Sequence, residues 1–280
     1  MTVQALNGLA LAHGRWVNQP VSQGRRLLVV NLMPTKEATE LQFLNLLART
    51  KVDCQVGFAY PVSHHFRYGD AAAIKRTYWP LSIAFAQPFD GVIVTGAPVE
   101  QLAFPKVDYW AEFTTLVQWL HCHHQAVVYE CWASQAALHV RYGWRTQRLA
   151  QKLFGIYQTR PLVPDNCYFR NLGAGGVIRM PQSRHTRLQL PAQLPADLTL
   201  LAKSDEVEAF LLTTQDQREL FITGHPEYAR DTLAREYARD LARGLAIQAP
   251  HHYYRPGTTE IAAQWQATST LLYTNWLSQL

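Results

Sequence analysis

Short apolar runs alternate with amphipathic segments along most of this 280-residue chain. The run Leu27–Leu32 predicts a buried strand, and Pro34 ends it. From Lys36 to Leu47 the apolar residues recur at helical spacing, so a helix is expected next. The same two kinds of segment continue along the chain, with strands predicted at Cys54–Ala59, Gly91–Thr95, Ala126–Glu130, Leu198–Leu201 and Leu220–Thr223, and helices at Asp108–His121, Trp132–Tyr142 and Ala229–Leu245. This alternation predicts an α/β fold with a mostly parallel, doubly wound sheet and helices on both faces.

Three segments depart from the alternation. Residues 1–26 form a polar leader that contains glycine, and residues 250–280 form an aromatic-rich extension that we expect to pack back on the core. The stretch 158–196 holds five prolines and three glycines, which predicts β-hairpins and loops attached to the sheet. We therefore expect one domain over 1–280, with its α/β core at 27–249.

Composition narrows the class of protein. Hydrophobic residues make up 48% of the chain and charged residues 17%, with a mean hydropathy of −0.16, which excludes a disordered chain. No apolar run approaches the roughly 18 residues that a membrane span needs. The short run Ala5–Ala12 has no basic residue before it, so a signal peptide is not expected. The four cysteines are scattered along the chain, which favours reduced thiols and a cytoplasmic location.

The formal charge of +5 raises the question of a nucleic-acid partner. The basic residues are spread along the chain, and the densest stretch, Arg230–Arg243, also carries acidic residues. We expect neither a nucleic-acid nor a membrane partner. The run His121–His124 has metal-ligand residue types, but adjacent side chains cannot all face one ion, so no metal site is expected. The glycine-rich run at 173–176 is interpreted as a turn, because it lacks the spacing of a dinucleotide loop.

Cys131 stands where the apolar strand Ala126–Glu130 runs directly into the helix at Trp132. The free N–H groups of a helix N-terminus favour a thiolate, and the Trp132 N–H is placed to stabilise an oxyanion. This is the arrangement of a nucleophile elbow with cysteine in place of serine. A small buried cysteine at a strand end is the alternative that this segment leaves open.

A second segment, Leu220–Glu227, favours the nucleophile over the buried structural cysteine. A predicted strand ends in Gly224-His225-Pro226-Glu227, so the imidazole and the carboxylate can lie on one side of the strand end. A carboxylate in that place holds a histidine in the tautomer that offers a basic nitrogen to a thiol. Together the two segments favour a Cys131–His225–Glu227 catalytic triad.

These residues carry a resemblance to known proteins. Four blocks and the chain end contribute to it, namely Val30–Glu40 (with Asn-Leu-Met-Pro), Val94–Glu100 (with Thr-Gly-Ala-Pro), Cys131–Ala137, Thr223–Tyr228 and Thr274–Leu277. In this order, over roughly residues 27–277, the chain resembles the class I glutamine amidotransferase-like fold and, within it, the homoserine O-acyltransferase (homoserine transsuccinylase) family.

The resemblance implies a ping-pong acyl transfer. Cys131 would take the acyl group from an acyl-CoA, and His225, oriented by Glu227, would act as general base on the acceptor hydroxyl. The Ala97 N–H resembles the second oxyanion donor of the family, beside that of Trp132. The positions that match substrate-binding residues of the family are Lys36, Lys152, Ser183, Arg184 and Arg239. The family also implies a homodimer, with no bound cofactor and an acyl-CoA as co-substrate.

Glu100 bears on the acyl group. In the family a glycine at this position goes with succinyl and a glutamate with acetyl, and a carboxylate there would repel the succinyl carboxylate. We therefore expect acetyl-CoA as the donor, with succinyl-CoA as the alternative.

The expected acceptor is L-homoserine, as in methionine biosynthesis. L-Serine, as in cysteine biosynthesis, stays open because one methylene separates the two by only about 1–3 kcal/mol in a pocket. The chain departs from the family in its N-terminal segment, in the loop 63–69, and in Glu130, which replaces an apolar or small residue before the nucleophile. A glutamine-hydrolysing amidotransferase and a non-catalytic binding protein on the same fold are the remaining alternatives.

Overall fold

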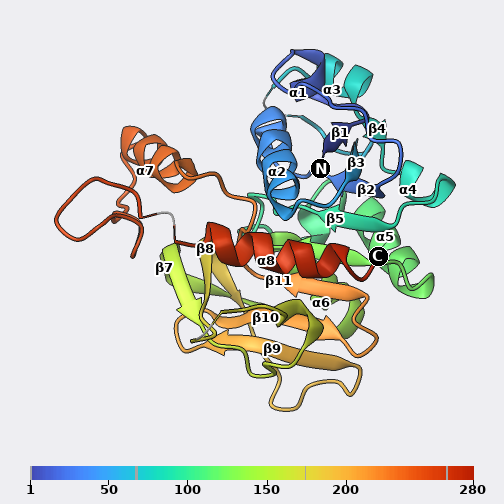
Figure 1. Ribbon diagram of the computed structural model, residues 1–280. Coiled ribbons are helices and arrows are strands. Elements are labelled where there is room, and N and C mark those ends of the chain that lie inside the picture. The colour runs from blue at the N-terminus through green and yellow to red at the C-terminus, as the bar shows by residue number, and fades with distance from the viewer. Residues whose placement is uncertain (1, 67–68, 174, 263) are drawn as a thin grey trace.

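A mixed nine-stranded sheet forms the centre of the fold in the computed structural model, which describes residues 2–66, 69–173, 175–262 and 264–280 (Figure 1). Its strands are β1 (Val3–Ala5), β2 (Arg25–Val30), β3 (Cys54–Tyr60), β4 (Trp79–Pro80), β5 (Gly91–Val94), β6 (Val127–Glu130), β9 (Leu198–Ser204), β10 (Glu208–Thr214) and β11 (Glu219–Ile222). The order is β1-β3-β2-β5-β6-β11-β10-β9, and β4 also pairs with β3. Strands β1 to β6 and β11 run parallel, whereas β10 is antiparallel to β11 and β9.

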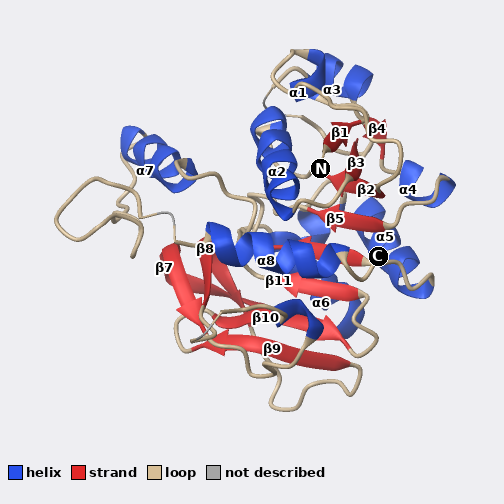
Figure 2. Ribbon diagram, in the orientation of Figure 1, coloured by secondary structure: helices blue, strands red, loops and turns tan. Residues whose placement is uncertain are grey.

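Helices cover both faces of this sheet (Figure 2). They are α1 (Leu9–Ala12), α2 (Lys36–Thr50), α3 (Ala71–Thr77), α4 (Ile83–Ala86), α5 (Trp110–Cys122), α6 (Trp132–Tyr142), α7 (Thr232–Ala242) and α8 (Gln266–Leu277), with 3₁₀ turns at Phe104–Lys106 and Cys167–Phe169. Neighbouring residues of β2 point to opposite faces, so Leu27 and Val29 join the core under α2 and α8 while Leu28 and Val30 join the core under α5 and α6. The predicted doubly wound sheet is confirmed.

A long antiparallel ribbon stands beside the sheet. It pairs β7 (Thr146–Thr159) with β8 (Ile178–Leu188), so the hairpin expected within 158–196 begins twelve residues earlier than its predicted boundary. The ribbon, α7 and the segment after α7 share a small core that includes Phe154, Tyr228 and Trp265. This core fixes the ribbon and α7 over the carboxyl ends of the central strands.

Both ends of the chain pack onto the core. Within the expected leader, β1 pairs in parallel with β3, so this segment is part of the sheet. Within the expected extension, α8 packs against α2 (Figure 1). Among the described residues, no helix combines the length and apolar character of a membrane span. The glycine-rich run includes Ala174, which lies outside the described residues; its other residues form a turn in which Gly176 N–H donates to Gly173 O at 3.0 Å.

Candidate active site

Cys131 lies in a strained turn between β6 and α6. Its φ of 47° and ψ of −113° are rare for a residue with a side chain and cost about 1–3 kcal/mol. The turn is held because the Cys131 N–H donates to Ile222 O of β11 at 2.7 Å and the Gln135 N–H donates to Cys131 O at 3.3 Å. This backbone conformation places the Cys131 side chain at the N-terminus of α6, as expected for a nucleophile elbow.

His225 and Glu227 follow the neighbouring strand β11 and reach the same point. His225 Nδ1 lies 2.9 Å from Glu227 Oε1, and both side chains are buried. Burial by itself lowers the pKa of His225, but the facing Cys131, hydrogen-bonded to the ring, and nearby carboxylates outweigh it, so the pKa of His225 is raised. The three side chains therefore form the predicted Cys–His–Glu arrangement.

Gly96, at the end of β5, packs against two members of this arrangement. A Cβ at this position would lie 3.1 Å from Cys131 Cβ, 3.1 Å from His225 Cε1 and 3.8 Å from Cys131 Sγ. The next residue, Ala97, is one of the residues that line the cavity in front of Cys131. A residue without a side chain thus lets the backbone that carries the Ala97 N–H approach the thiol closely.

A cavity of about 650 Å³ opens in front of Cys131 and His225. Residues from the strand ends, from the loop at 64–66, from the loop 97–109, from the ribbon and from α7 line it. The loop that departs from the family thus borders the cavity through His64, His65 and Phe66, whereas Arg67 and Tyr68 lie outside the described residues. A concave pocket that joins a nucleophile to a base is the expected form of an active site.

Lys36 and Glu100 both line this cavity. Lys36 is nearly buried, and its Nζ donates to Asn31 O at 2.5 Å. Burial lowers the pKa of Lys36 to about 7, although Glu40 nearby opposes the shift. The Glu100 carboxylate is half-buried and has no ion-pair partner among the described residues. An unpaired carboxylate therefore faces the space that leads to Cys131.

The ribbon and α7 form a polar wall of the cavity. Glu236 lies at its centre and accepts hydrogen bonds from Ser183 Oγ at 2.6 Å and from Tyr228 Oη at 2.6 Å. Lys152 Nζ lies 3.5 Å from Glu236 Oε2 and 3.2 Å from Asp240 Oδ2. Three polar groups are thus already paired with one carboxylate before any substrate is present.

Arg239 contributes a partly free cation to the same wall. Its Nε donates to Asp240 Oδ1 at 2.8 Å, and about half of its side chain is exposed. In the part of the chain that the structure describes, its two terminal nitrogens have no hydrogen-bond partner. The free edge of this guanidinium suits a carboxylate.

Arg184 is not brought to the cavity, although its neighbour Ser183 is. Successive residues of β8 point to opposite faces, so Ser183 and His185 line the cavity while Arg184 is buried behind it. Its guanidinium donates to Gln182 Oε1 and to the carbonyls of Thr186 and Val207. Burial lowers the pKa of Arg184 to about 10, while Cys131 raises it. The structure therefore gives Arg184 no contact with the substrate cavity.

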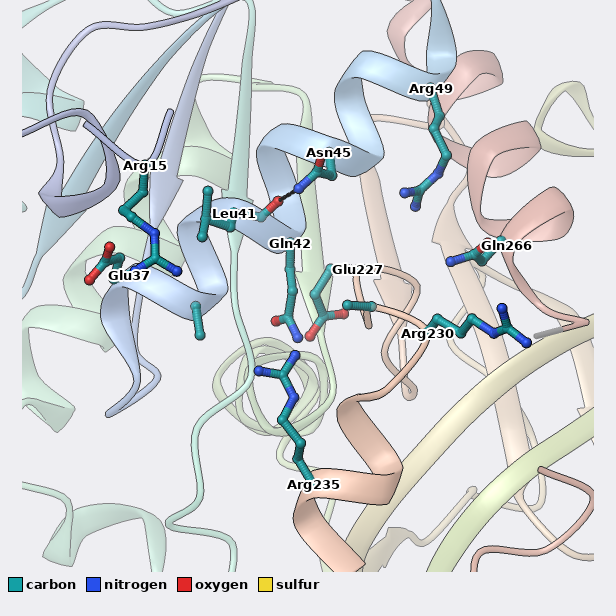
Figure 3. A pocket seen from close by; sticks show the side chains of 12 residues that line it. Arg15, Glu37, Leu41, Gln42, Asn45, Arg49, Glu227, Arg230, Arg235 and Gln266 are labelled. Carbon is teal, nitrogen blue, oxygen red and sulfur yellow. Dashed lines mark hydrogen bonds between the residues drawn. The ribbon is translucent and has the colours of Figure 1, made fainter. Parts of the chain in front are cut away.

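A second cavity of about 460 Å³ borders Glu227 (Figure 3). Four arginines line it, Arg15, Arg49, Arg230 and Arg235, and Gln42 of α2 and Arg235 of α7 point toward Glu227. No cysteine, serine, threonine or lysine is among the described residues that line it. The first cavity is therefore the candidate active site, and Glu227 lies between the two.

Sequence reasoning missed several polar residues of the site. Tyr228 stacks on the His225 ring, with centroids 4.2 Å apart, and His185, Glu236 and Asp240 also line the cavity. The signal was present for Tyr228, which belongs to the block Thr223–Tyr228 that resembles the family, and for Glu236, which precedes the family-like Arg239 by three residues. For His185 the alternation of β8 was the available signal.

The fold has clear counterparts among solved structures. A glutamine amidotransferase from Thermotoga maritima matches with a TM-score of 0.60 and 12% identity, over 92% of this chain and 98% of that chain. A glutamine amido transferase from Methylobacillus flagellatus matches with a TM-score of 0.57 and 12% identity, over 92% and 95%. These similarities define the fold class, a class I glutamine amidotransferase-like fold.

Sequence comparison defines the family. Residues 7–280 match the family described as homoserine O-succinyltransferase. A homoserine O-acetyltransferase of Lactococcus lactis is 40% identical over 90% of this chain and 79% of its own length, and one of Bacillus subtilis is 34% identical over 91% and 84%. The chain belongs to the homoserine O-succinyltransferase family, and it is an acyltransferase.

Proposed function

We propose that the protein transfers the acetyl group of acetyl-CoA to the side-chain hydroxyl of L-homoserine. Two observations support this function: Cys131 and His225 line one cavity, with Glu227 behind the imidazole, and relatives with 34–40% identity are named homoserine O-acetyltransferase. The observation that carries the choice of acetyl is Glu100, whose carboxylate lines the same cavity as Cys131. A succinyl carboxylate would meet this charge in a partly desolvated space.

In the first half-reaction the Cys131 thiolate attacks the thioester carbonyl carbon. The N–H groups of Trp132 and Ala97 stabilise the oxyanion, and the CoA thiolate leaves with the proton that His225 held. The product is an acetyl thioester on Cys131.

In the second half-reaction the neutral His225 takes the proton of the acceptor hydroxyl while its oxygen attacks the acetyl carbonyl. The Cys131 thiolate leaves, and the O-acetyl ester is released. Arg239 binds the α-carboxylate of the acceptor with its free edge, and Glu236 binds the α-ammonium group. Lys36 lies where an anionic donor would raise its pKa and hold it as a cation.

L-Serine is the second candidate acceptor. The observation in its favour is the loop that departs from the family, because His64, His65 and Phe66 of this loop line the cavity. A shorter acceptor needs a cavity that closes further over it. A homodimer and a cytoplasmic location remain predictions.

A donor and acceptor matrix tests this function. Purified protein is given acetyl-CoA or succinyl-CoA with homoserine, serine, glutamine or water, and free CoA and ammonia are measured. We expect CoA release with acetyl-CoA and homoserine, and one acetyl group on the Cys131 peptide when the acceptor is omitted. Faster turnover with succinyl-CoA than with acetyl-CoA would contradict the proposed donor. Faster turnover with serine than with homoserine would contradict the proposed acceptor.

Glu100→Gly and Glu100→Gln separate space from charge in this experiment. We expect Glu100→Gly to increase the ratio of succinyl to acetyl transfer at least about tenfold, and Glu100→Gln to increase it less. Unchanged ratios in both variants would show that Glu100 does not select the donor.

A further inference from the structure

Glu130 is the last residue of β6 and precedes the nucleophile. Its partner in the parallel register is Ile222 of β11, and its side chain has no exposed surface. A buried acidic side chain in the middle of a sheet costs several kcal/mol unless it is neutral or paired. The triad described above makes no use of it.

Two contacts define its surroundings. Tyr273 of α8 donates its hydroxyl to Glu130 Oε1 at 2.5 Å, and the carboxyl group of Glu227 lies close enough to that of Glu130 for each to shift the pKa of the other. Glu227 Oε1 in turn holds His225 Nδ1 at 2.9 Å. A continuous row of hydrogen-bonding groups thus runs from the C-terminal helix to the catalytic imidazole.

The second oxygen of each of the two carboxyl groups is buried next to the other carboxyl group. Glu130 Oε2 and Glu227 Oε2 are both buried, and among the described residues neither has a conventional donor. Two carboxylates in contact, both buried, cannot both be ionised, whereas one proton between them satisfies both oxygens. A single shared proton therefore satisfies both oxygens, because one carries it and the other accepts the hydrogen bond.

The geometry favours the proton on Glu130, because Glu227 Oε1 faces the His225 imidazole at 2.9 Å whereas Glu130 Oε1 faces the uncharged hydroxyl of Tyr273. Burial and the neighbouring Glu227 raise the pKa of Glu130 well above its ordinary range. Burial also raises the pKa of Glu227, but the hydrogen bond from Glu130 opposes that shift. Among the described residues, His225 and Glu236 are charged groups near the pair, and the second cavity, which Glu227 lines, also holds Glu37 and the four arginines Arg15, Arg49, Arg230 and Arg235.

We propose that Glu130 is a positioning residue, a neutral acid that donates its proton to Glu227 Oε2 and keeps Glu227 as the anion behind His225. This inference rests on the triad of the proposed function. Without the donor, burial would favour transfer of the proton from the imidazolium to Glu227, and the positive charge that supports the Cys131 thiolate would be lost. Tyr273 orients the donor by fixing the other oxygen of Glu130.

Two substitutions of Glu130 distinguish a positioning role from a role in packing alone. Glu130→Gln keeps the shape, can donate an N–H to Glu227 and can accept from Tyr273, whereas Glu130→Val removes both interactions. The main readout is alkylation of Cys131 by iodoacetamide as a function of pH, followed by the mass of the Cys131 peptide. It requires no substrate, so it stays informative if the proposed acetyl transfer fails.

We expect Glu130→Gln to keep the wild-type alkylation profile and a kcat within about threefold. In Glu130→Val the acid limb of the profile should move up by about one pH unit and kcat should fall at least about tenfold. Tyr273→Phe should shift the profile in the same direction by less. A wild-type profile in Glu130→Val, or an equal loss in Glu130→Gln, would overturn the proposal.

Infrared spectroscopy of the wild type and Glu130→Gln gives an answer even if Glu130→Val does not fold. The wild type should show a protonated-carboxyl C=O band at pH 7 that is absent from Glu130→Gln. If the difference spectrum holds only a carboxylate band, Glu130 is ionised and the proposal is wrong.

Discussion

The triad and the polar wall of ribbon and α7 face the same cavity but are built differently. At the strand ends, Cys131, His225 and Glu227 are held by backbone hydrogen bonds and by close packing against Gly96. On the wall, Ser183 and Tyr228 both donate to one carboxylate, Glu236, and Lys152 pairs with Glu236 and Asp240.

This difference suggests that the triad carries out the reaction and that the wall binds the substrate. The reacting groups are already in place in the folded protein. This favours a fast chemical step, because no free energy is needed to order them when the substrate binds. The wall must exchange internal contacts for contacts with substrate, so its residues should act mainly on binding. The substitutions below test this division.

Cys131→Ala gives the largest expected effect. Removal of the nucleophile should lower kcat at least about 10⁴-fold and abolish acetylation of the protein. Steady-state CoA release and intact-protein mass measure both. Cys122→Ala, at the exposed cysteine, is the control and should match the wild type. Residual acetylation of the Cys131→Ala protein would place the nucleophile elsewhere.

Gly96→Ala tests the packing of the triad. The added Cβ would sit 3.1 Å from Cys131 Cβ and from His225 Cε1, so one of them must move by a few tenths of an ångström. We expect kcat to fall about 100-fold with little change in KM. Gly173→Ala, where a Cβ meets no atom within 4 Å, serves as the matched control. Equal kcat values in the two variants would mean that the triad tolerates displacement.

Glu236→Gln tests the wall. Loss of the charge weakens the contacts of Lys152 and removes the proposed partner of the acceptor ammonium group. We expect the acceptor KM to rise about tenfold, or about 1.4 kcal/mol, with kcat within about threefold. Asp231→Asn, in an exposed ion pair with Arg235, is the control. A fall in kcat at constant KM would instead place Glu236 in the chemical step.

Lys36 gives the smallest effect, on stability. Its folded pKa of about 7 is below the unfolded value of 10.5, so the unfolded chain binds more protons above pH 7. The penalty is complete below pH 7 and is relieved as the pH rises toward 10.5. Urea unfolding of the wild type should therefore gain about 1 kcal/mol relative to Lys36→Met between about pH 7 and 8. Parallel curves for the two proteins would show an ordinary pKa for Lys36.

The same two regions divide what sequence reasoning could reach. The strands that are apolar on both faces, and the Cys131 and His225 junctions that end two of them, depend on local pattern and could be located. Strand β10 was missed because no helix separates it from its neighbours, so the alternation fails there. Helix α8 was missed because apolar and small polar residues are buried around most of its surface, which leaves no amphipathic period.

The residues of the wall could be identified from the sequence, but the directions of their side chains could not. The resemblance pointed to Ser183 and Arg184 as a pair, and strand alternation within β8 places only Ser183 at the cavity. The pairing of Lys152 with Glu236 and Asp240 brings together residues more than 80 positions apart, which no local pattern reveals. The contact of Glu130 with Glu227 and Tyr273 is of the same kind.

Acetylation of Cys131 is the most direct test of the proposed mechanism. Purified protein is mixed with acetyl-CoA without acceptor, quenched rapidly, digested and weighed, and homoserine is then added to a parallel sample. We predict one acetyl group on the Cys131 peptide, which disappears with formation of O-acetylhomoserine. CoA release from a mixture of both substrates without any acetyl group on Cys131 would contradict this mechanism.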